Sequence, residues 1–153
     1  MAISKVSTPA KMIHDAFDLF EVAVAASVRR LEEKEFIPSS TTSFFLIGSS
    51  LELALLCYLS HKGFASEQLL SINHDLEVAL QQANELGLKQ IADLSDDFFG
   101  SVKQLNADFK FQNIQDAHIN SSNSAIFNSL QGGTQYLLAT IASEISQSQS
   151  KAA

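Results

Sequence analysis

The residues from Phe44 to Lys62 constrain the fold of this chain more than any other stretch. They read FFLIGSSLELALLCYLSHK, and apolar side chains recur at almost every angle around a helix drawn through them. A helix that is hydrophobic all round must be covered by its neighbours. We therefore expect a central helix here, ended by Gly63, with the remaining helices packed around it.

The other segments with apolar periodicity are predicted to be amphipathic helices. Their apolar residues recur every three or four positions, which places them on one face of a helix. No alternating apolar and polar run bounded by turn residues predicts a strand. The fold class is therefore all-α: an up-and-down helical bundle of four long helices plus short helical pieces. We predict long helices at about 9–32, 44–62, 89–109 and 124–145, a shorter helix capped by Asn73 and ended by Gly87, and a single turn near residue 66.

The chain has the length of one domain. Its 153 residues can bury a sizeable core without disulfide or metal support. We place this single helical domain at residues 1–146. The residues that follow, 147–153 (QSQSKAA), are low in complexity and are expected to form a disordered tail.

The charge of the chain argues against one class of function. The net charge is −7 at pH 7, and the ten basic residues are scattered, with only Arg29 and Arg30 adjacent. Non-specific nucleic-acid binding needs clustered lysines and arginines that displace phosphate counterions. We therefore expect no such binding.

Three features predict a cytoplasmic protein that does not associate with membranes. The first residues lack the apolar core of a signal peptide. The apolar run Phe44–Leu59 is shorter than the roughly 20 residues that a membrane span needs, and Glu52 interrupts it. Cys57, the lone cysteine, lies in the same run, where a free thiol is usually buried.

The sequence contains no motif of the metal-binding or phosphate-binding sites that are common in helical proteins. Ferritin-like metal sites need a glutamate three residues before a histidine, and none of the four histidines has one. There is no zinc-ligand spacing and no glycine-rich phosphate loop. His14, Asp18 and Glu21 share one helix face, which indicates a solvated surface more often than a metal site. We predict no metal, no cofactor and no catalytic residue.

Two polar residues of the central region need an explanation. A carboxylate at Glu52 is costly inside an apolar helix unless it has a partner. Either it reaches a polar group at the helix edge, or it pairs with His74 or with a second subunit. His74 and Asp75 are adjacent, so on a helix their side chains would not face each other. A structural junction and a ligand-binding or catalytic role both remain open for them.

Four segments of the chain, in this order, resemble segments of one protein family. Ser50–Gly63 resembles a helix of HEPN-domain proteins, with an acidic residue, leucines and a lysine-glycine end. Asn73–Leu76 and Gln82–Leu88 are similar to the "HDL … A…GL" segment of one bacterial HEPN-like branch. Leu105–Phe109 resembles the "LN..Y" element of that branch. The resemblance spans roughly residues 40–118.

The resemblance implies a fold and a mode of action. HEPN domains are all-α bundles that commonly form homodimers, and many are ribonucleases with an Arg-x(4–6)-His motif across the dimer interface. This chain has only Arg29 and Arg30, and no histidine follows either at that spacing. No arginine lies four to seven residues before His74 or His118. This chain therefore lacks the arginine of the motif that defines the ribonucleases of the family.

We therefore expect a non-catalytic HEPN-like module. It would homodimerise and bind a partner protein or small ligand, in a stress or toxin–antitoxin type of system, with Glu52, His74, Asp75 and His118 as candidate binding residues. One alternative is a divergent HEPN ribonuclease that uses His74 or His118. The second alternative is a purely structural helical adaptor.

Overall fold

The computed structural model describes residues 7–32, 40–112 and 124–152. Over these residues the secondary structure is helical, with seven helices and no strand, which confirms the predicted all-α class. The loop predicted around Pro38 and most of the one predicted after residue 109 lie outside the described residues. The helices are α1 Pro9–Glu32, α2 Ser40–His61, α3 Ser66–Ile72, α4 Leu76–Glu85, α5 Leu88–Ile91, α6 Asp96–Phe109 and α7 Ser124–Ala152.

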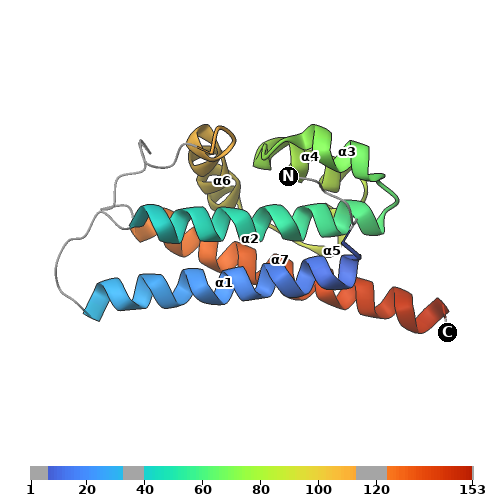
Figure 1. Ribbon diagram of the computed structural model, residues 1–153, viewed down its shortest axis with the longest axis horizontal. Coiled ribbons are helices and arrows are strands. Elements are labelled where there is room, and N and C mark those ends of the chain that lie inside the picture. The colour runs from blue at the N-terminus through green and yellow to red at the C-terminus, as the bar shows by residue number, and fades with distance from the viewer. Residues whose placement is uncertain (1–6, 33–39, 113–123, 153) are drawn as a thin grey trace.

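The three longest helices, α1, α2 and α7, lie lengthwise beside one another (Figure 1). The shorter helices α3, α4 and α6 pack on the side of α2 that faces away from α1, and α5 contacts α4. α2 contacts α1, α3, α4, α6 and α7, so its predicted central position is confirmed. Leu51, Leu55 and Leu59 on α2 are fully buried.

α2 is long and apolar enough to cross a membrane by length and composition, over Thr42–His61. The expectation that the apolar run is too short for a span rests on a helix that begins at Phe44, whereas α2 begins at Ser40. In the structure, most of this segment is buried against the other helices. That burial is what the core helix of a helical domain requires.

Close contacts position two of the helices that neighbour α2, namely α1 and α6. On the α1 side, Ser50 Oγ donates a hydrogen bond of 2.7 Å to the carbonyl oxygen of Ala16. On the α6 side, Gly48 lies against Phe109, and a Cβ added at this glycine would come within 2.7 Å of the Phe109 ring. The small residue therefore lets α6 approach the backbone of α2 closely.

The short helices begin and end differently from the prediction. Asn73 does not cap α4: Asn73 (φ 51°) and His74 (φ 66°) both adopt left-handed conformations that end α3. Asp75 is the cap, and its side chain accepts a hydrogen bond from Val78 N. Asparagine tolerates the left-handed region better than most residues, which explains its place at the end of a helix.

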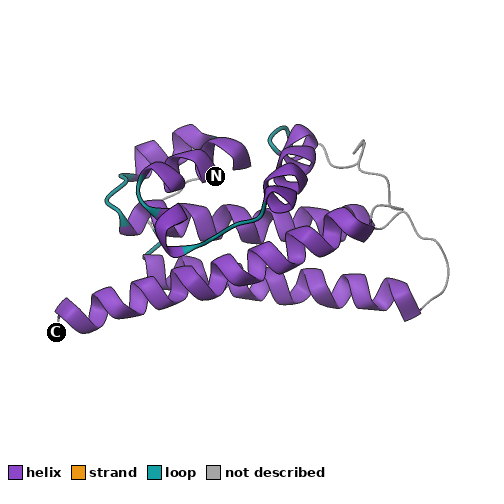
Figure 2. Cartoon of the chain, turned by 180° about the vertical axis from the view of Figure 1, so that it is seen from behind, coloured by secondary structure: helices purple, strands orange, loops and turns teal. Residues whose placement is uncertain are grey.

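The helix predicted at 89–109 is divided into α5 and α6. An extended linker at residues 92–95 separates them (Figure 2). Ser95 caps α6 by accepting a hydrogen bond from Phe98 N, and Asp96 and Asp97 follow in the first turn, where the helix dipole favours negative charge. The prediction followed the apolar periodicity, which continues across the linker. The cap at Ser95 and the two aspartates after it mark the start of α6.

α7 is continuous and longer than predicted. It passes through Gly132 and Gly133 without a break and continues to Ala152, where the composition predicts a disordered tail from residue 147. Ser148 Oγ lies 3.2 Å from His61 Nε2 at the end of α2. This contact ties the last part of α7 to the central helix.

Candidate functional site

The structure brings Glu52 and His74 together. Glu52 projects from the middle of α2, and His74 lies in the left-handed turn between α3 and α4. Nδ1 of His74 is 2.9 Å from Oε2 and 3.2 Å from Oε1 of Glu52. The Glu52 side chain is 16% exposed and the His74 side chain 47% exposed. The pair therefore joins α2 to the start of α4 at the edge of the core.

The burial of Glu52 perturbs its ionisation. Loss of water around the carboxylate raises the pKa of Glu52, and the neighbouring His74 partly offsets this through charge and hydrogen bonding. Burial has the larger effect, so the carboxylate is held in its charged form less readily than in water.

A second set of polar contacts continues from this pair to α6. Asn106 is buried, and its Oδ1 accepts a hydrogen bond of 2.8 Å from Leu76 N, the first residue of α4. Nδ2 of Asn106 donates to Asp75 Oδ1 at 2.9 Å and to Glu77 Oε1 at 3.3 Å. These contacts satisfy an orphan N–H at the helix start and fix α6 against it. We call the set Glu52, His74, Asp75, Glu77 and Asn106 the α4 junction.

The predicted binding residues have different outcomes. Glu52, His74 and Asp75 gather at the α4 junction, and the role of binding a ligand there stays a prediction. His118 lies outside the described residues. Asn106 did not emerge as a site residue, although it lies in the Leu105–Phe109 element that carries part of the resemblance. An isolated asparagine in an amphipathic helix gives no signal of a partner 30 residues away in the chain.

The acidic face of α1 differs slightly from the predicted one. His14, Asp15 and Asp18 bring their ligand atoms within 4.8 Å of one another, whereas the prediction named Glu21 in place of Asp15. Asp15 already binds Lys11 at 2.8 Å, and this hydrogen bond is the largest of the effects that lower the pKa of Asp15. Exposed acidic groups of this kind are common on helix surfaces.

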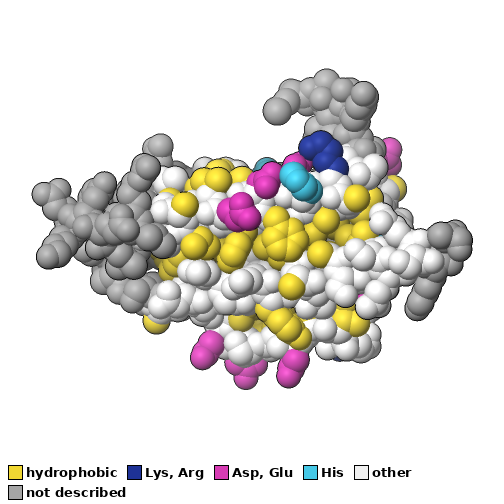
Figure 3. Space-filling model, turned by 90° about the horizontal axis from the view of Figure 1, so that it is seen from below, with side chains coloured by type: hydrophobic (Ala, Val, Ile, Leu, Met, Phe, Trp, Pro, Cys, Tyr) yellow, Lys and Arg dark blue, Asp and Glu magenta, His cyan; other side chains and the backbone are white. Residues whose placement is uncertain are grey.

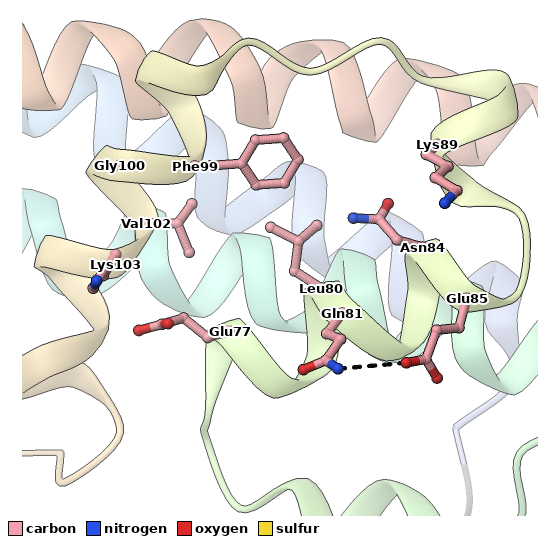
Figure 4. Close-up of a pocket in the computed structure, with 10 residues that line it drawn as sticks. All are labelled: Glu77, Leu80, Gln81, Asn84, Glu85, Lys89, Phe99, Gly100, Val102 and Lys103. Carbon is pink, nitrogen blue, oxygen red and sulfur yellow. Dashed lines mark hydrogen bonds between the residues drawn. The ribbon is translucent and has the colours of Figure 1, made fainter.

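A cleft opens beside the α4 junction, between α4, α5 and α6 (Figure 4). It has a volume of about 580 Å³, within the range of small-ligand sites. Leu80, Phe99 and Val102 form its apolar part, and Gly100 leaves open space beside them. Polar and charged residues line the rest: Glu77, Gln81, Asn84, Glu85, Lys89 and Lys103.

The cleft could not be read from the sequence, because it depends on the unpredicted break between α5 and α6. The face of α4 that lines it was visible as residues 77, 80, 81, 84 and 85, at helical spacing. Only Leu80 of these is apolar.

No family model, no curated protein and no solved structure matches this chain. The class of the protein is therefore defined by its own fold and site: an all-helical protein with a central apolar helix, a polar junction at α4 and an adjacent cleft. Membership of the HEPN family stays a prediction from the sequence motifs.

Proposed function

We propose that this chain is a non-catalytic binding module with an up-and-down, HEPN-like helical bundle. It acts as a cytoplasmic homodimer and binds a partner protein or small ligand, in a stress or toxin–antitoxin type of system. The order of the four motifs supports the family, and the missing arginine supports the loss of ribonuclease activity.

The observation that carries this proposal is that the polar side chains of the α4 junction bond to one another and to the backbone of α4. Its hydrogen bonds join α2, α4 and α6: Glu52 binds His74, and Asn106 binds Asp75, Glu77 and Leu76 N. Polar groups committed to such a network stabilise a structure. The open cleft beside them, with an apolar floor and charged edges, has the composition of a binding site.

The face formed by α1 and α7 suits the homodimer. Figure 3 shows a stripe of hydrophobic side chains along this side of the molecule, with acidic side chains towards its edges. Over residues 125–150 of α7 the only charged residue is Glu144. Depletion of charge is typical of the core of an interface.

Two measurements test the proposal. Light scattering after size exclusion should give twice the monomer mass of 16.6 kDa at micromolar concentration. Incubation with total RNA should leave it intact, with the wild type and His74→Ala indistinguishable. A single monomer peak at all concentrations would remove the dimer from the proposal. Cleavage that His74→Ala abolishes would replace the binding module with an enzyme.

One observation favours the divergent ribonuclease as a second candidate. Glu52 binds Nδ1 of His74, and among the described residues nothing binds Nε2 of this half-exposed ring. A carboxylate that orients a histidine in this way is half of a general acid–base device. Nε2 would accept the proton of a ribose 2′-hydroxyl, and the oxygen of that hydroxyl would attack phosphorus to form a 2′,3′-cyclic phosphate. The bond from phosphorus to the 5′-oxygen would break, and the 5′-oxygen would take a proton from water. Glu52→Gln should then reduce RNA cleavage as His74→Ala does.

A further inference from the structure

The lysines whose side chains the structure describes divide into two groups. Lys11, Lys62 and Lys110 each contact a carboxylate or an aromatic ring. Lys89 and Lys103 have neither contact among the residues that the structure describes, and both line the cleft between α4 and α6. In a protein of net charge −7, two ammonium groups without a carboxylate partner at one cleft are a specific feature.

The carboxylates of the cleft, by contrast, already accept hydrogen bonds. Glu77 Oε1 accepts from Asn106 at 3.3 Å, and Glu85 Oε1 accepts from Gln81 at 3.4 Å. Among the described residues, the charged groups of the cleft that have neither a hydrogen bond nor an ion pair are therefore the two lysines. A ligand that completes the site should supply negatively charged acceptors.

Asn84 adds a second requirement. Its side chain extends from α4 into the cleft (Figure 4), and its buried Oδ1 has no hydrogen-bond partner among the residues that the structure describes. A carboxamide has donors and acceptors on one plane. A peptide backbone offers both an N–H and a C=O to such a group, whereas a simple dicarboxylate offers acceptors only. This favours a peptide as the occupant.

The dimensions of the cleft set the spacing of the negatively charged groups on the ligand. Lys103 lies near one end and Lys89 near the other, with Phe99 between them (Figure 4). Glu77 and Glu85 mark the same two ends on α4, and eight helical residues rise about 12 Å. An extended peptide covers that length in about four residues. Two acidic side chains four positions apart would therefore reach the two lysines.

We propose that the cleft binds a short acidic peptide segment of a partner protein. The two carboxylates of this segment pair with Lys89 and Lys103, and an apolar side chain between them packs on Leu80, Phe99 and Val102. The inference rests on the proposed function of a binding module and names the chemistry of its partner. Because the two lysines lie at the ends of the cleft and the apolar residues between them, the expected pattern is acid–x–apolar–x–acid.

The test uses two labelled peptides and the full chain. An acetylated, amidated Glu-Ala-Phe-Ala-Glu peptide is titrated with the protein by fluorescence polarisation, beside its Lys-Ala-Phe-Ala-Lys counterpart. The acidic peptide should bind more tightly, and added salt should weaken it, because exposed ion pairs are screened. The double variant Lys89→Ala/Lys103→Ala should weaken binding by about three- to tenfold, since each exposed pair contributes up to about fivefold.

The double variant Lys11→Ala/Lys110→Ala is the matched control. It also removes two positive charges, but from outside the cleft, so it should leave the affinity unchanged. Circular dichroism verifies that all variants fold. Absence of binding to the wild type, preference for the basic peptide, or equal affinity of the double variant would each overturn the inference. RNA cleavage that depends on His74 would overturn the non-catalytic function instead, so the two failures are distinguishable.

Discussion

At the scale of single residues, polar side chains inside this protein join helices. Asn106 alone makes three contacts, to Leu76 N, Asp75 and Glu77. Glu52 is the costly member of the α4 junction, because it lies on the central apolar helix and is mostly withdrawn from water. Its only hydrogen-bond partner among the described residues is His74. The ionisation of Glu52 should therefore be visible in the stability of the whole chain.

We predict that Glu52→Gln becomes progressively more stable than the wild type as the pH rises from 4 to 7. Burial raises the pKa of Glu52, so the fold favours the protonated carboxyl. The stability that this preference contributes is present below the unfolded pKa and is lost as the pH rises through the folded pKa. Each unit of pKa difference corresponds to about 1.4 kcal/mol.

Urea unfolding of both proteins at several pH values measures this difference. Glu67→Gln, at an exposed site on α3, serves as the control and should follow the wild type. Parallel stability curves for the wild type and Glu52→Gln would contradict the prediction, because they would mean that ionising Glu52 costs nothing.

We also predict that Cys57 does not react with thiol reagents in the native state. Its side chain is fully buried, and Sγ donates to the carbonyl oxygen of Pro9 at 3.1 Å. Burial raises the pKa of the thiol to about 12, so the reactive thiolate is scarce at neutral pH. Ellman's reagent should release about one equivalent of thiolate in denaturant and almost none without it. Rapid native labelling would show that α1 does not cover α2 at this point.

At the scale of elements, the sequence predicted best where burial and periodicity agree. α1 and α2 follow from one clear stripe and one continuous apolar run, and the observed bounds of α1 match the prediction. The break between α5 and α6 was missed because Ile91 and Leu94 continue the apolar spacing, although Ile91 is 37% exposed. Periodicity records which residues could face a core, and the chain direction at residue 92 depends on tertiary contacts.

The candidate site was predictable only in part, for a related reason. Glu52 is recognisable in the sequence as a carboxylate in an apolar helix, and a pair with His74 is one of the arrangements that the sequence leaves open for it. Asn106 and the cleft depend on how α6 packs against α4, and no local pattern encodes that packing. Asp75 caps α4 in place of the predicted Asn73, because Asn73 and His74 both have positive φ values. Sequence patterns do not reveal a positive φ for histidine.

The two adjacent glycines of α7 give a prediction at this scale. A Cβ on Gly133 would lie 2.0 Å from the ring of Phe98, whereas a Cβ on Gly132 would meet nothing within 4 Å. Gly133→Ala should therefore destabilise the protein by about 1–3 kcal/mol through overpacking between α6 and α7. Gly132→Ala should stabilise it by about 0.5–1 kcal/mol, because alanine is the better helix former.

Thermal and urea unfolding of the two variants measure this difference. Each variant is the control of the other, since both replace the same residue type in the same helix. Equal effects would mean that α6 does not approach α7 at Phe98. An unchanged Gly133→Ala would show that the Phe98 ring can move aside at little cost.

At the scale of the whole molecule, α2 holds the described helices in one core. It contacts α1 and α7 on one side and α3, α4 and α6 on the other. Its fully buried leucines belong to the same cluster as Phe98 of α6 and Leu137 of α7. A chain in which every layer shares one helix should unfold as a unit, because no part keeps its core when α2 is lost.

We predict that Leu51→Ala weakens every helix together. Leu51 is fully buried in α2, so truncation should cost about 2–5 kcal/mol in the free energy of unfolding. Leu70→Ala on α3 is the matched control: this side chain is 56% exposed, and its loss should change stability by less than about 0.5 kcal/mol. Within each of the three proteins, the helical circular dichroism signal and the accessibility of Cys57 should change at one and the same urea concentration, and this concentration should be lower for Leu51→Ala. If α3 to α6 melted before Cys57 became reactive, the chain would contain two folding units, and the cleft would belong to the less stable one.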